Sequence, residues 1–191
     1  TACIYIASVA NATEDGTQSV TITITENESS PTITLATSAT SIAENAGTSL
    51  TLTATSSIVA DEDITVTIST TGTGTEGTDY GTISDITISA GDTTGTVSFT
   101  PTDDSVYEGN ETGTVAISSV SGGSANESGT PQEVTITIND NESAPKVTLS
   151  TSASSIAENA GSSLTLTATL SNATTADVTV GISTSGTGTE G

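Results

Sequence analysis

Carboxylates are the side chains of this sequence that could do chemistry. The chain has 191 residues, and its 23 Asp and Glu residues stand against a single basic residue, Lys146, and no His, for a net charge of -22. Without His or Arg, and with one Cys and one Lys, the usual nucleophiles, general bases and anion clamps are missing. The composition therefore predicts a protein that is not an enzyme. The missing basic surface excludes nucleic acid as a partner.

The acidic residues gather between predicted strands and at strand ends rather than along the strands. In the middle of the chain they are Glu44, Glu76, Asp79, Asp103, Asp104, Glu108, Glu111, Asp140 and Glu142. In an antiparallel arrangement of seven strands, strand parity places these segments at the same end. Carboxylates crowded together without a basic partner repel one another, and a bound cation removes that repulsion. Oxygen ligands in loops, without His or Cys, favour Ca²⁺ as the cofactor.

Alternating apolar residues predict the strands that position these carboxylates. Ile64, Val66 and Ile68 alternate with threonines, and other segments repeat this period of two, which is typical of half-buried strands. Seven strands are expected at 32–43, 48–57, 63–71, 79–90, 94–102, 112–120 and 131–139. The residues expected to fill the core are Ile83, Ile88, Val97, Phe99, Val115, Ile117, Val134 and Ile136. So many short strands predict an all-β fold, a β-sandwich.

An internal repeat sets the domain organisation. Residues 41–47 recur as residues 155–161, an offset of 114, and 32 of the 46 pairs between 32–77 and 146–191 are identical. We therefore expect the C-terminal part of one repeat at 1–30, a complete repeat at 31–144 and the N-terminal part of another at 145–191. The two partial repeats need further strands, supplied either by a longer protein or by strand exchange between identical subunits.

Four motifs give the complete repeat a family resemblance. They are Ser41-Ile-Ala-Glu-Asn-Ala-Gly47, Gly77-Thr-Asp-Tyr-Gly81, Asp103-Asp-Ser-Val-Tyr-Glu-Gly-Asn-Glu111 and Val134-Thr-Ile-Thr-Ile-Asn-Asp-Asn-Glu142. With them the chain resembles the Calx-β repeat. The resemblance implies an immunoglobulin-like sandwich that binds a small calcium cluster at the end facing the next domain. With the repeat and the short linker at 139–145, we expect tandem seven-stranded sandwiches arranged as a rod. By motif position it implies a ligand set of Glu44, Asp79, Asp103, Asp104, Glu108 and Asp140.

Other conspicuous residues receive a structural interpretation. Asp61, Glu62 and Asp63 form an acidic run without converging partners, which is usually a solvated surface. Tyr80 and Tyr107 lie within the acidic loops and are expected to pack beneath the site. Cys3 is expected to fill a strand position as a small apolar side chain. No apolar stretch approaches about 18 residues, so we expect no membrane insertion.

Three functions remain open for such a chain. The first is a calcium-stiffened structural repeat of a secreted bacterial filament or giant surface adhesin, whose partners are calcium ions and neighbouring repeats or identical subunits. Its compartment would be extracellular, where calcium is abundant enough for weak structural sites. The second is a calcium sensor that regulates an attached domain. The third is an adhesin module that binds sugar or ice.

Overall fold

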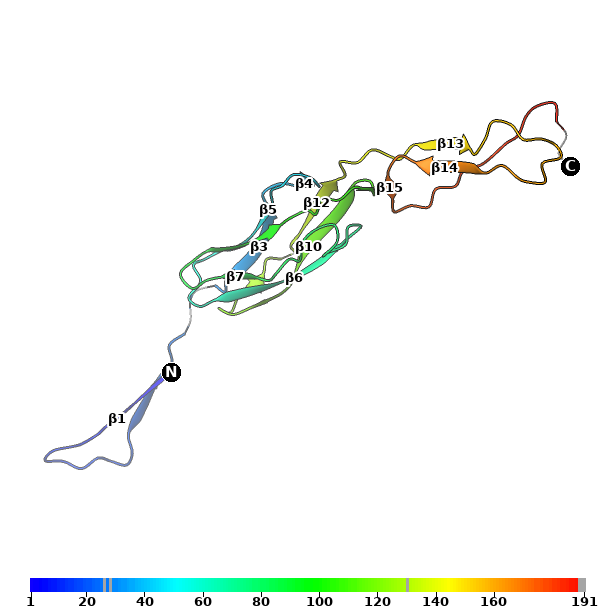
Figure 1. Cartoon of the computed structure of the whole chain (residues 1–191). Helices are drawn as coiled ribbons and strands as arrows, with labels where there is room; N and C mark the ends of the chain where they lie inside the picture. Colours follow the sequence, from blue (N-terminus) through cyan, green and yellow to red (C-terminus); the bar gives the residue numbers. More distant parts are fainter. Residues whose placement is uncertain (26, 28, 130, 189–191) are drawn as a thin grey trace. The chain divides into compact units, whose positions relative to one another are not determined.

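The regular structure of this chain is β-strand. The computed structural model describes residues 1–191 apart from 26, 28, 130 and 189–191, and every regular element in this part is a strand (Figure 1). No described segment forms a helix of the length and hydrophobicity needed to cross a membrane. Two compact units, Thr1–Ser30 and Pro31–Gly191, make up the chain. The all-β prediction is confirmed.

Two sheets build the sandwich in the middle of the chain (Figure 1). The first has five strands in the order β4-β12-β10-β6-β7, antiparallel except for the parallel pair β12–β4. The second has four strands in the order β11-β3-β5-β8, with β11–β3 parallel. The strands of the first sheet are β4 (Ser41–Ala43), β6 (Ile64–Gly72), β7 (Ile86–Ile88), β10 (Glu111–Ser121) and β12 (Glu133–Asn139). Those of the second are β3 (Thr32–Thr37), β5 (Leu50–Ser56), β8 (Thr94–Phe99) and β11 (Asn126–Glu127).

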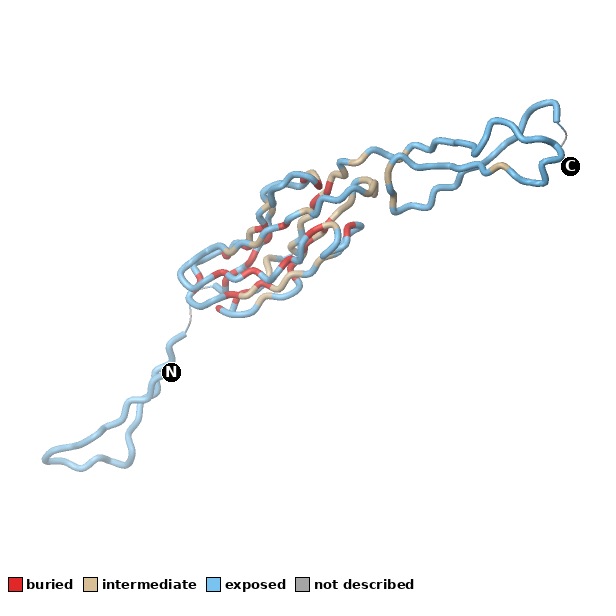
Figure 2. Tube along the Cα trace, in the orientation of Figure 1, coloured by how far each residue is buried: buried red, intermediate tan, exposed pale blue. Residues whose placement is uncertain are grey.

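The hydrophobic core contains residues of both sheets. Alternate residues of each strand point inward, such as Leu52 and Ala54 of β5 and Ile64 and Val66 of β6, all fully buried. Figure 2 shows this burial concentrated in the middle part of the chain. Burying each large aliphatic side chain stabilises the fold by about 1.5–3 kcal/mol. Of the predicted core, these residues are buried: Ile83, Ile88, Phe99, Val115, Ile117 and Ile136. Val97 and Val134 are half-buried against it.

The predicted strand 32–43 is two strands in different sheets, and the prediction of one continuous strand is wrong. β3 pairs with β5 in one sheet, whereas β4 pairs with β12 in the other. The buried positions change parity between them, from Ile33 and Leu35 to Ile42 and Glu44. Because side chains alternate strictly along a strand, this change requires a break, and the chain crosses from one sheet to the other there. The crossing delivers Glu44 to the end of the first sheet.

The predicted strand 79–90 is also shorter than expected. Only β7 is regular, and before it Tyr80 forms isolated bridges with Glu76 and Pro101. Tyr80 is 1% exposed, so its ring anchors this irregular segment to the core. Two short strands were not predicted, β11 and β9 (Val106–Tyr107). Strands of two residues carry no measurable periodicity, which explains why the sequence pattern misses them.

The N-terminal unit is a hairpin of β1 (Ala2–Tyr5) and β2 (Ser19–Ile22). Ile4 pairs with Val20 as Val115 pairs with Val134 in the complete sandwich. The hairpin therefore corresponds to β10–β12. Its apolar side chains, which include Ile4, Val20 and Ile22, are exposed in this unit.

The strand position predicted for Cys3 is confirmed, because Cys3 lies in β1. Cys3 pairs with Thr21 across the hairpin, one position along from the apolar pair of Ile4 and Val20. Successive residues of a strand point to opposite faces, so Cys3 lies on the other face of the hairpin. Its thiol is exposed, with Sγ 3.6 Å from Thr21 Oγ1.

Residues after Pro145 repeat the start of the sandwich. β13 (Val147–Thr151) pairs with β14 (Leu166–Leu170), with Val147 opposite Leu170 just as Ile33 lies opposite Ser56. These pairs differ by the repeat offset of 114 at both positions. A further strand, β15 (Ala173–Thr174), runs parallel to β9 of the complete sandwich. The division at residues 30 and 144 stays a prediction, consistent with these correspondences.

Candidate metal centre

Five segments bring carboxylates to one end of the sandwich. Glu44 follows β4, and Asp140 and Glu142 follow β12. Asp79 lies between β6 and β7, and Glu111 is the first residue of β10. The segment 103–110 between β8 and β10, which we call the acidic arm, carries Asp103, Asp104 and Glu108 and contains β9. The strand order brings the ends of β4, β12 and β10 side by side, so their acidic residues are neighbours.

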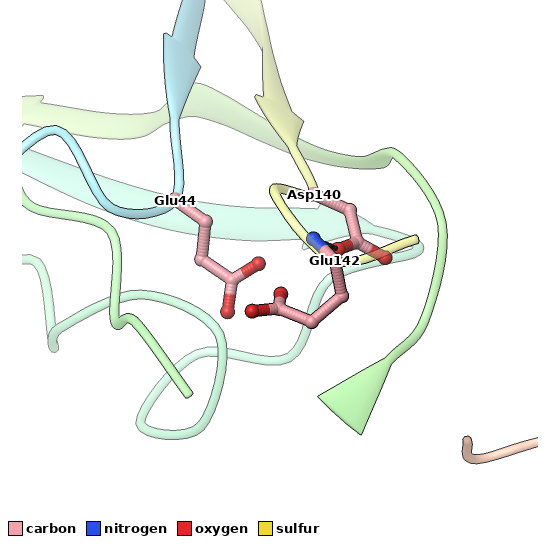
Figure 3. A group of neighbouring side chains, drawn as sticks. All are labelled: Glu44, Asp140 and Glu142. Atoms are coloured by element: carbon pink, nitrogen blue, oxygen red, sulfur yellow. Dashed lines mark hydrogen bonds between the residues drawn. The ribbon is translucent and has the colours of Figure 1, made fainter. Parts of the chain in front are cut away.

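The first group of carboxylates consists of Glu44, Asp140 and Glu142 (Figure 3). Each contributes an oxygen, and these oxygens all lie within 4.8 Å of one another. Figure 3 shows the carboxylates of Glu44 and Glu142 facing each other, with Asp140 beside the backbone of Glu142. Glu44 is only 9% exposed, although the group holds no basic side chain. The three oxygens are close enough to share one cation.

Backbone amides hold Asp140 in its ionised form. Its Oδ1 accepts the N–H of Glu142 at 2.7 Å, and its Oδ2 accepts those of Glu108 at 2.9 Å and Gly109 at 2.5 Å. Burial acts to raise the pKa of Asp140, but these donated hydrogen bonds outweigh burial and lower it below its usual value. Asp140 therefore connects the acidic arm to the segment that follows β12.

The second group consists of Asp79, Glu108 and Glu111, again with one oxygen of each within 4.8 Å of the others. All three side chains are half-buried. Asp79 Oδ2 also accepts the N–H of Thr75 at 2.5 Å, which fixes the loop between β6 and β7. The second group thus joins the acidic arm to that loop, as the first joins β4 to the end of β12.

Asp103 and Asp104 lie at the edge of the first group, in the exposed part of the arm. The N–H of Asp104 donates to Glu44 Oε1 at 3.1 Å, and Asp104 Oδ1 accepts the N–H of Val106 at 2.7 Å. The negative charges of both aspartates act on Glu44. They are therefore neighbours of the first group, although neither belongs to the two sets of converging oxygens.

Comparison with known families identifies the family of this chain. The sequence model of the Calx-beta domain matches residues 26–142, more than half of the chain. The chain belongs to the Calx-beta family. Domains of this family are calcium-binding modules. A comparison with curated proteins found no match.

Several solved Calx structures are similar to this Calx-beta chain. The crystal structure of CBD12 from CALX1.2 has a TM-score of 0.46 and 22% identity, covering 53% of this chain and 41% of that one. The apo form of the Calx CBD1 domain has the same score and identity, covering 58% of this chain and 99% of the domain. Calcium binding domain CBD12 of CALX1.1 has a TM-score of 0.45 and 22% identity, covering 52% and 40%. The chain spans less than half of the two CBD12 chains.

The predicted ligands of the Calx-beta domain divide between the two groups. Glu44 and Asp140 lie in the first and Asp79 and Glu108 in the second, whereas Asp103 and Asp104 lie in neither. Their role as ligands stays a prediction. Sequence reasoning left Glu142 and Glu111 out of the ligand set, although it placed both among the acids expected at this end. The signal was available, because each stands within three residues of a predicted ligand in the acidic motifs.

Burial and the crowding of like charges make protonation of Glu44 and Glu142 in the first group easier. Burial raises the pKa of Glu44, and the charges of Asp104, Asp140 and Asp103 raise it further, against the hydrogen bond from the Asp104 N–H. Burial also raises the pKa of Glu142, as do its contact with Asp140 and the charge of Glu44. Glu142 is half-buried, and its Oε2 is inaccessible to solvent. This oxygen accepts no hydrogen bond from the described residues. A buried carboxylate oxygen without a donor is costly unless a cation neutralises it.

The second group shows the same tendency more strongly. Burial raises the pKa of Glu111 to about 7, with further contributions from Asp79 and Glu108. Burial and the charges of Asp79, Asp104 and Asp140 likewise raise the pKa of Glu108. Carboxylates that are harder to ionise than usual gain stability from either protons or a cation.

The donors of both groups fit calcium. Every group member is a carboxylate, with no sulfur or imidazole, and Lys146 is the only basic side chain of the sequence. Ca²⁺ takes roughly six to eight oxygen ligands in loops of flexible geometry. The residues that would hold it are Glu44, Asp140 and Glu142 in the first group and Asp79, Glu108 and Glu111 in the second. A bound cation would supply the positive charge that these side chains lack.

Tyr80 and Phe99 form the floor beneath the second group. Their rings stack with centroids 4.7 Å apart at an interplanar angle of 23°, and both are fully buried. A Cβ built on Gly74 would lie 3.4 Å from Glu111 Oε2 and 3.5 Å from Tyr80 Cε1. The Glu111 carboxylate and the Tyr80 ring thus flank the same glycine. The predicted position beneath the site is confirmed for Tyr80, while Tyr107 is half-buried in the arm.

This floor leaves no room for a side chain at Gly113. A Cβ there would lie 2.9 Å from Phe99 Cε2 and 3.0 Å from Cζ. We expect Gly113→Ala to lower the free energy of unfolding by about 1–3 kcal/mol, because overpacking a dense core forces rings off their preferred positions. Urea denaturation measures the loss. Gly81→Ala is the control, since the nearest atom to a Cβ there is Thr100 O at 3.9 Å, and equal losses in both variants would contradict the close packing.

Proposed function

We propose that this Calx-beta chain is a calcium-binding structural repeat of a secreted bacterial filament or giant surface adhesin. In this proposal successive immunoglobulin-like sandwiches form a rod, and Ca²⁺ at the junctions between them stiffens the array. The chain is not an enzyme, because it lacks the side chains that most catalytic mechanisms require. Its partners are calcium ions and neighbouring repeats or identical subunits, and its location is extracellular.

The observation that carries the proposal is the position of Glu142. This residue follows the last strand of the complete sandwich, and yet its carboxylate joins Glu44 and Asp140 in the first group (Figure 3). Its buried Oε2 accepts no hydrogen bond from the described residues. A cation bound there would tie the segment that leads to the next repeat to the body of the sandwich. Calcium would thus restrict rotation at the junction.

Hydrogen bonds on the other side of the junction shorten the free linker. The N–H of Lys146 donates to Ser171 Oγ and the N–H of Ser171 donates to Lys146 O, both at 2.9 Å. Asn172 Nδ2 donates to Ser143 O at 3.0 Å. Residues 143–146 are therefore held against the following repeat, while residue 142 belongs to the acidic group of the preceding one. A linker fixed at both ends has little freedom to bend.

The sequence repeat supports a structural role over a regulatory one. Of the pairs between 32–77 and 146–191, 32 of 46 are identical, including positions on the solvent side of the strands. Near-identical units are typical of arrays in which each repeat contacts its neighbours and the whole acts as a fibre. Extracellular calcium is abundant enough to fill structural sites of modest affinity.

Small-angle X-ray scattering of the full chain tests this function directly. During titration with CaCl₂ we expect the scattering to change from that of a flexible chain to that of a stiff, extended particle, with a narrower distribution of sizes. Titration with MgCl₂ is the control, because Mg²⁺ requires stricter octahedral geometry. Identical scattering with calcium and with EDTA would contradict stiffening. A micromolar calcium response with a change of conformation but no stiffening would instead favour a sensor.

A further inference from the structure

The junction also contains a direct contact between repeats. Ala173 and Thr174, which form β15 in the repeat after Pro145, run parallel to Val106 and Tyr107 of the acidic arm. Parallel pairing between two chain segments joins them through their backbones and depends little on side chains. The contact therefore shows how the loop after the second long strand of one repeat binds the arm of the repeat before it.

The arm that makes this contact is held by the acidic groups. The N–H of Val106 donates to Asp104 Oδ1, and those of Glu108 and Gly109 donate to Asp140 Oδ2. The paired residues Val106 and Tyr107 lie between these anchors. Any cation that fixes Asp104 and Asp140 would also fix the backbone on which β15 pairs.

The complete repeat has the same loop, and the tip of this loop is apolar and exposed. The offset of 114 maps Ala173 and Thr174 onto Val59 and Ala60. Both loops begin at the same clamp, because the N–H of Ser57 donates to Thr32 O and the N–H of Thr32 donates to Ser57 Oγ, each at 3.0 Å. This is the pattern seen at Ser171 and Lys146. The two loops therefore leave their sandwiches at equivalent positions.

Exposed apolar surface marks this loop in the complete repeat. Ile58 is 43% and Val59 is 59% exposed, and they are the only large hydrophobic side chains classed as exposed between 31 and 144, position 130 aside. Ala60 beside them is 2% exposed, and its backbone is bonded to Asp92 O and to the N–H of Gly91. The inner side of the loop is thus fixed to its own sandwich, while Val59 remains available on the outer side.

We propose that Ile58 and Val59 form a docking edge that binds the acidic arm of another Calx-beta unit, with Val59 paired to the arm as Ala173 of β15 pairs with Val106 of β9. The occupant is the segment equivalent to Ser105–Tyr107 in that other unit, whose Val106 and Tyr107 positions supply apolar side chains for Ile58 and Val59. The calcium dependence of this docking rests on the proposed function. Docking itself rests on the observed β9–β15 pair and the repeat.

Charge makes this docking more dependent on calcium than the junction within the chain. Asp61, Glu62 and Asp63 follow the docking edge, whereas the equivalent residues 175–177 include a single acid, Asp177. The incoming arm brings its own aspartates and glutamate. Two acidic segments approach each other only at an electrostatic cost, which a cation bound to the arm offsets.

Disulfide trapping between two copies of the full chain tests the docking edge. In a Cys3→Ser background, the donor carries Val106→Cys together with Ala173→Pro, which removes a backbone donor of β15 and frees the arm. The acceptor carries Val59→Cys. Because a disulfide needs Cα atoms about 4.4–6.8 Å apart, we expect about tenfold more cross-linked heterodimer than with Thr51→Cys, an exposed control on β5.

The outcomes separate docking from calcium binding. Strong cross-linking at Val59 in calcium and little in EDTA supports both, while equal cross-linking in the two supports docking and contradicts its calcium dependence. Calcium binding by titration calorimetry without selective cross-linking at Val59 overturns docking and leaves the proposed function intact. The Ala173→Pro donor counts as folded when its calcium binding by titration calorimetry equals that of a donor that keeps Ala173, so that misfolding cannot imitate a negative result.

Discussion

Removing calcium is expected to lower the melting temperature of the protein by about 10 °C or more. A ligand at about 100 times its Kd stabilises the folded protein by about 2.7 kcal/mol per site. Each kcal/mol shifts the melting temperature of a small domain by about 4–8 °C. The reason is the concentration of carboxylates in the two groups, with one oxygen from each member within 4.8 Å of the others and no basic side chain among them. Differential scanning calorimetry in saturating calcium and in EDTA measures the difference. Magnesium in place of calcium is expected to restore less of it. Equal melting temperatures would contradict a stabilising metal.

The Glu44→Gln variant distinguishes the effect of metal binding on the melting temperature from the effect of charge repulsion. Without calcium, the variant is expected to melt higher than the wild type, because it removes one of several carboxylates that repel one another in a nearly buried position. With calcium it is expected to melt lower, and its calcium affinity should fall about 10–100-fold, or about 1.4–2.7 kcal/mol. Glu133→Gln is the matched control, an exposed acid at the start of β12 that belongs to neither group. A Glu44→Gln effect of the same sign in both conditions would assign Glu44 a purely structural role.

Much of the fold is encoded in periodicity that can be read from the sequence. Ile64 and Val66, like Ile136 and Ile138, are separated by one threonine. This spacing identifies the buried face, because every second side chain of a half-buried strand points into the core. The crossing between β3 and β4 was missed, although the change of parity from Leu35 to Ile42 encodes it. To recognise this change of parity, one must know that the side chains of both β3 and β4 are buried. Their burial depends on which strands of the opposite sheet pack against them. Tertiary packing, not local pattern, decides the break.

The sequence predicts that the acidic residues gather at one end of the sandwich, but it does not predict which carboxylates lie in the same group. Strand parity correctly brings Glu44, Glu108 and Asp140 to the same end of the sandwich, because an antiparallel order fixes where each strand finishes. Which carboxylates then meet depends on backbone geometry in the loops. The amides of the acidic arm turn toward Asp140, and this positions Glu108 beside Asp79 while leaving Asp103 exposed. No spacing in the sequence specifies those turns.

The stability of the calcium-free protein is expected to fall as the pH rises from about 4.5 to about 7. Burial and the charges of Asp79 and Glu108 raise the pKa of Glu111 from 4.5 to about 7. In the unfolded chain this carboxyl loses its proton near 4.5, whereas the folded protein retains it up to about 7, so folding becomes less favourable across that window and is constant above it. After allowance for partial exposure the loss is about 1–2 kcal/mol. The lowered pKa of Asp140 acts in the opposite direction, but only below its ordinary value of 3.8.

Calcium should reverse this pH dependence, because a cation and a proton compete for the same oxygens. Denaturant unfolding at pH 5 and pH 7.5 is expected to show the loss of stability in EDTA, and an equal or greater stability at pH 7.5 with calcium present. Glu111→Gln cannot ionise, so it should remove most of the pH dependence in EDTA, while the control Glu133→Gln should retain it. Calcium affinity measured at the same two values is expected to be higher at pH 7.5. Equal stability in EDTA at the two pH values would mean that Glu111 does not retain its proton in the folded protein. It would then contradict electrostatic repulsion as a reason for this end of the sandwich to bind a cation.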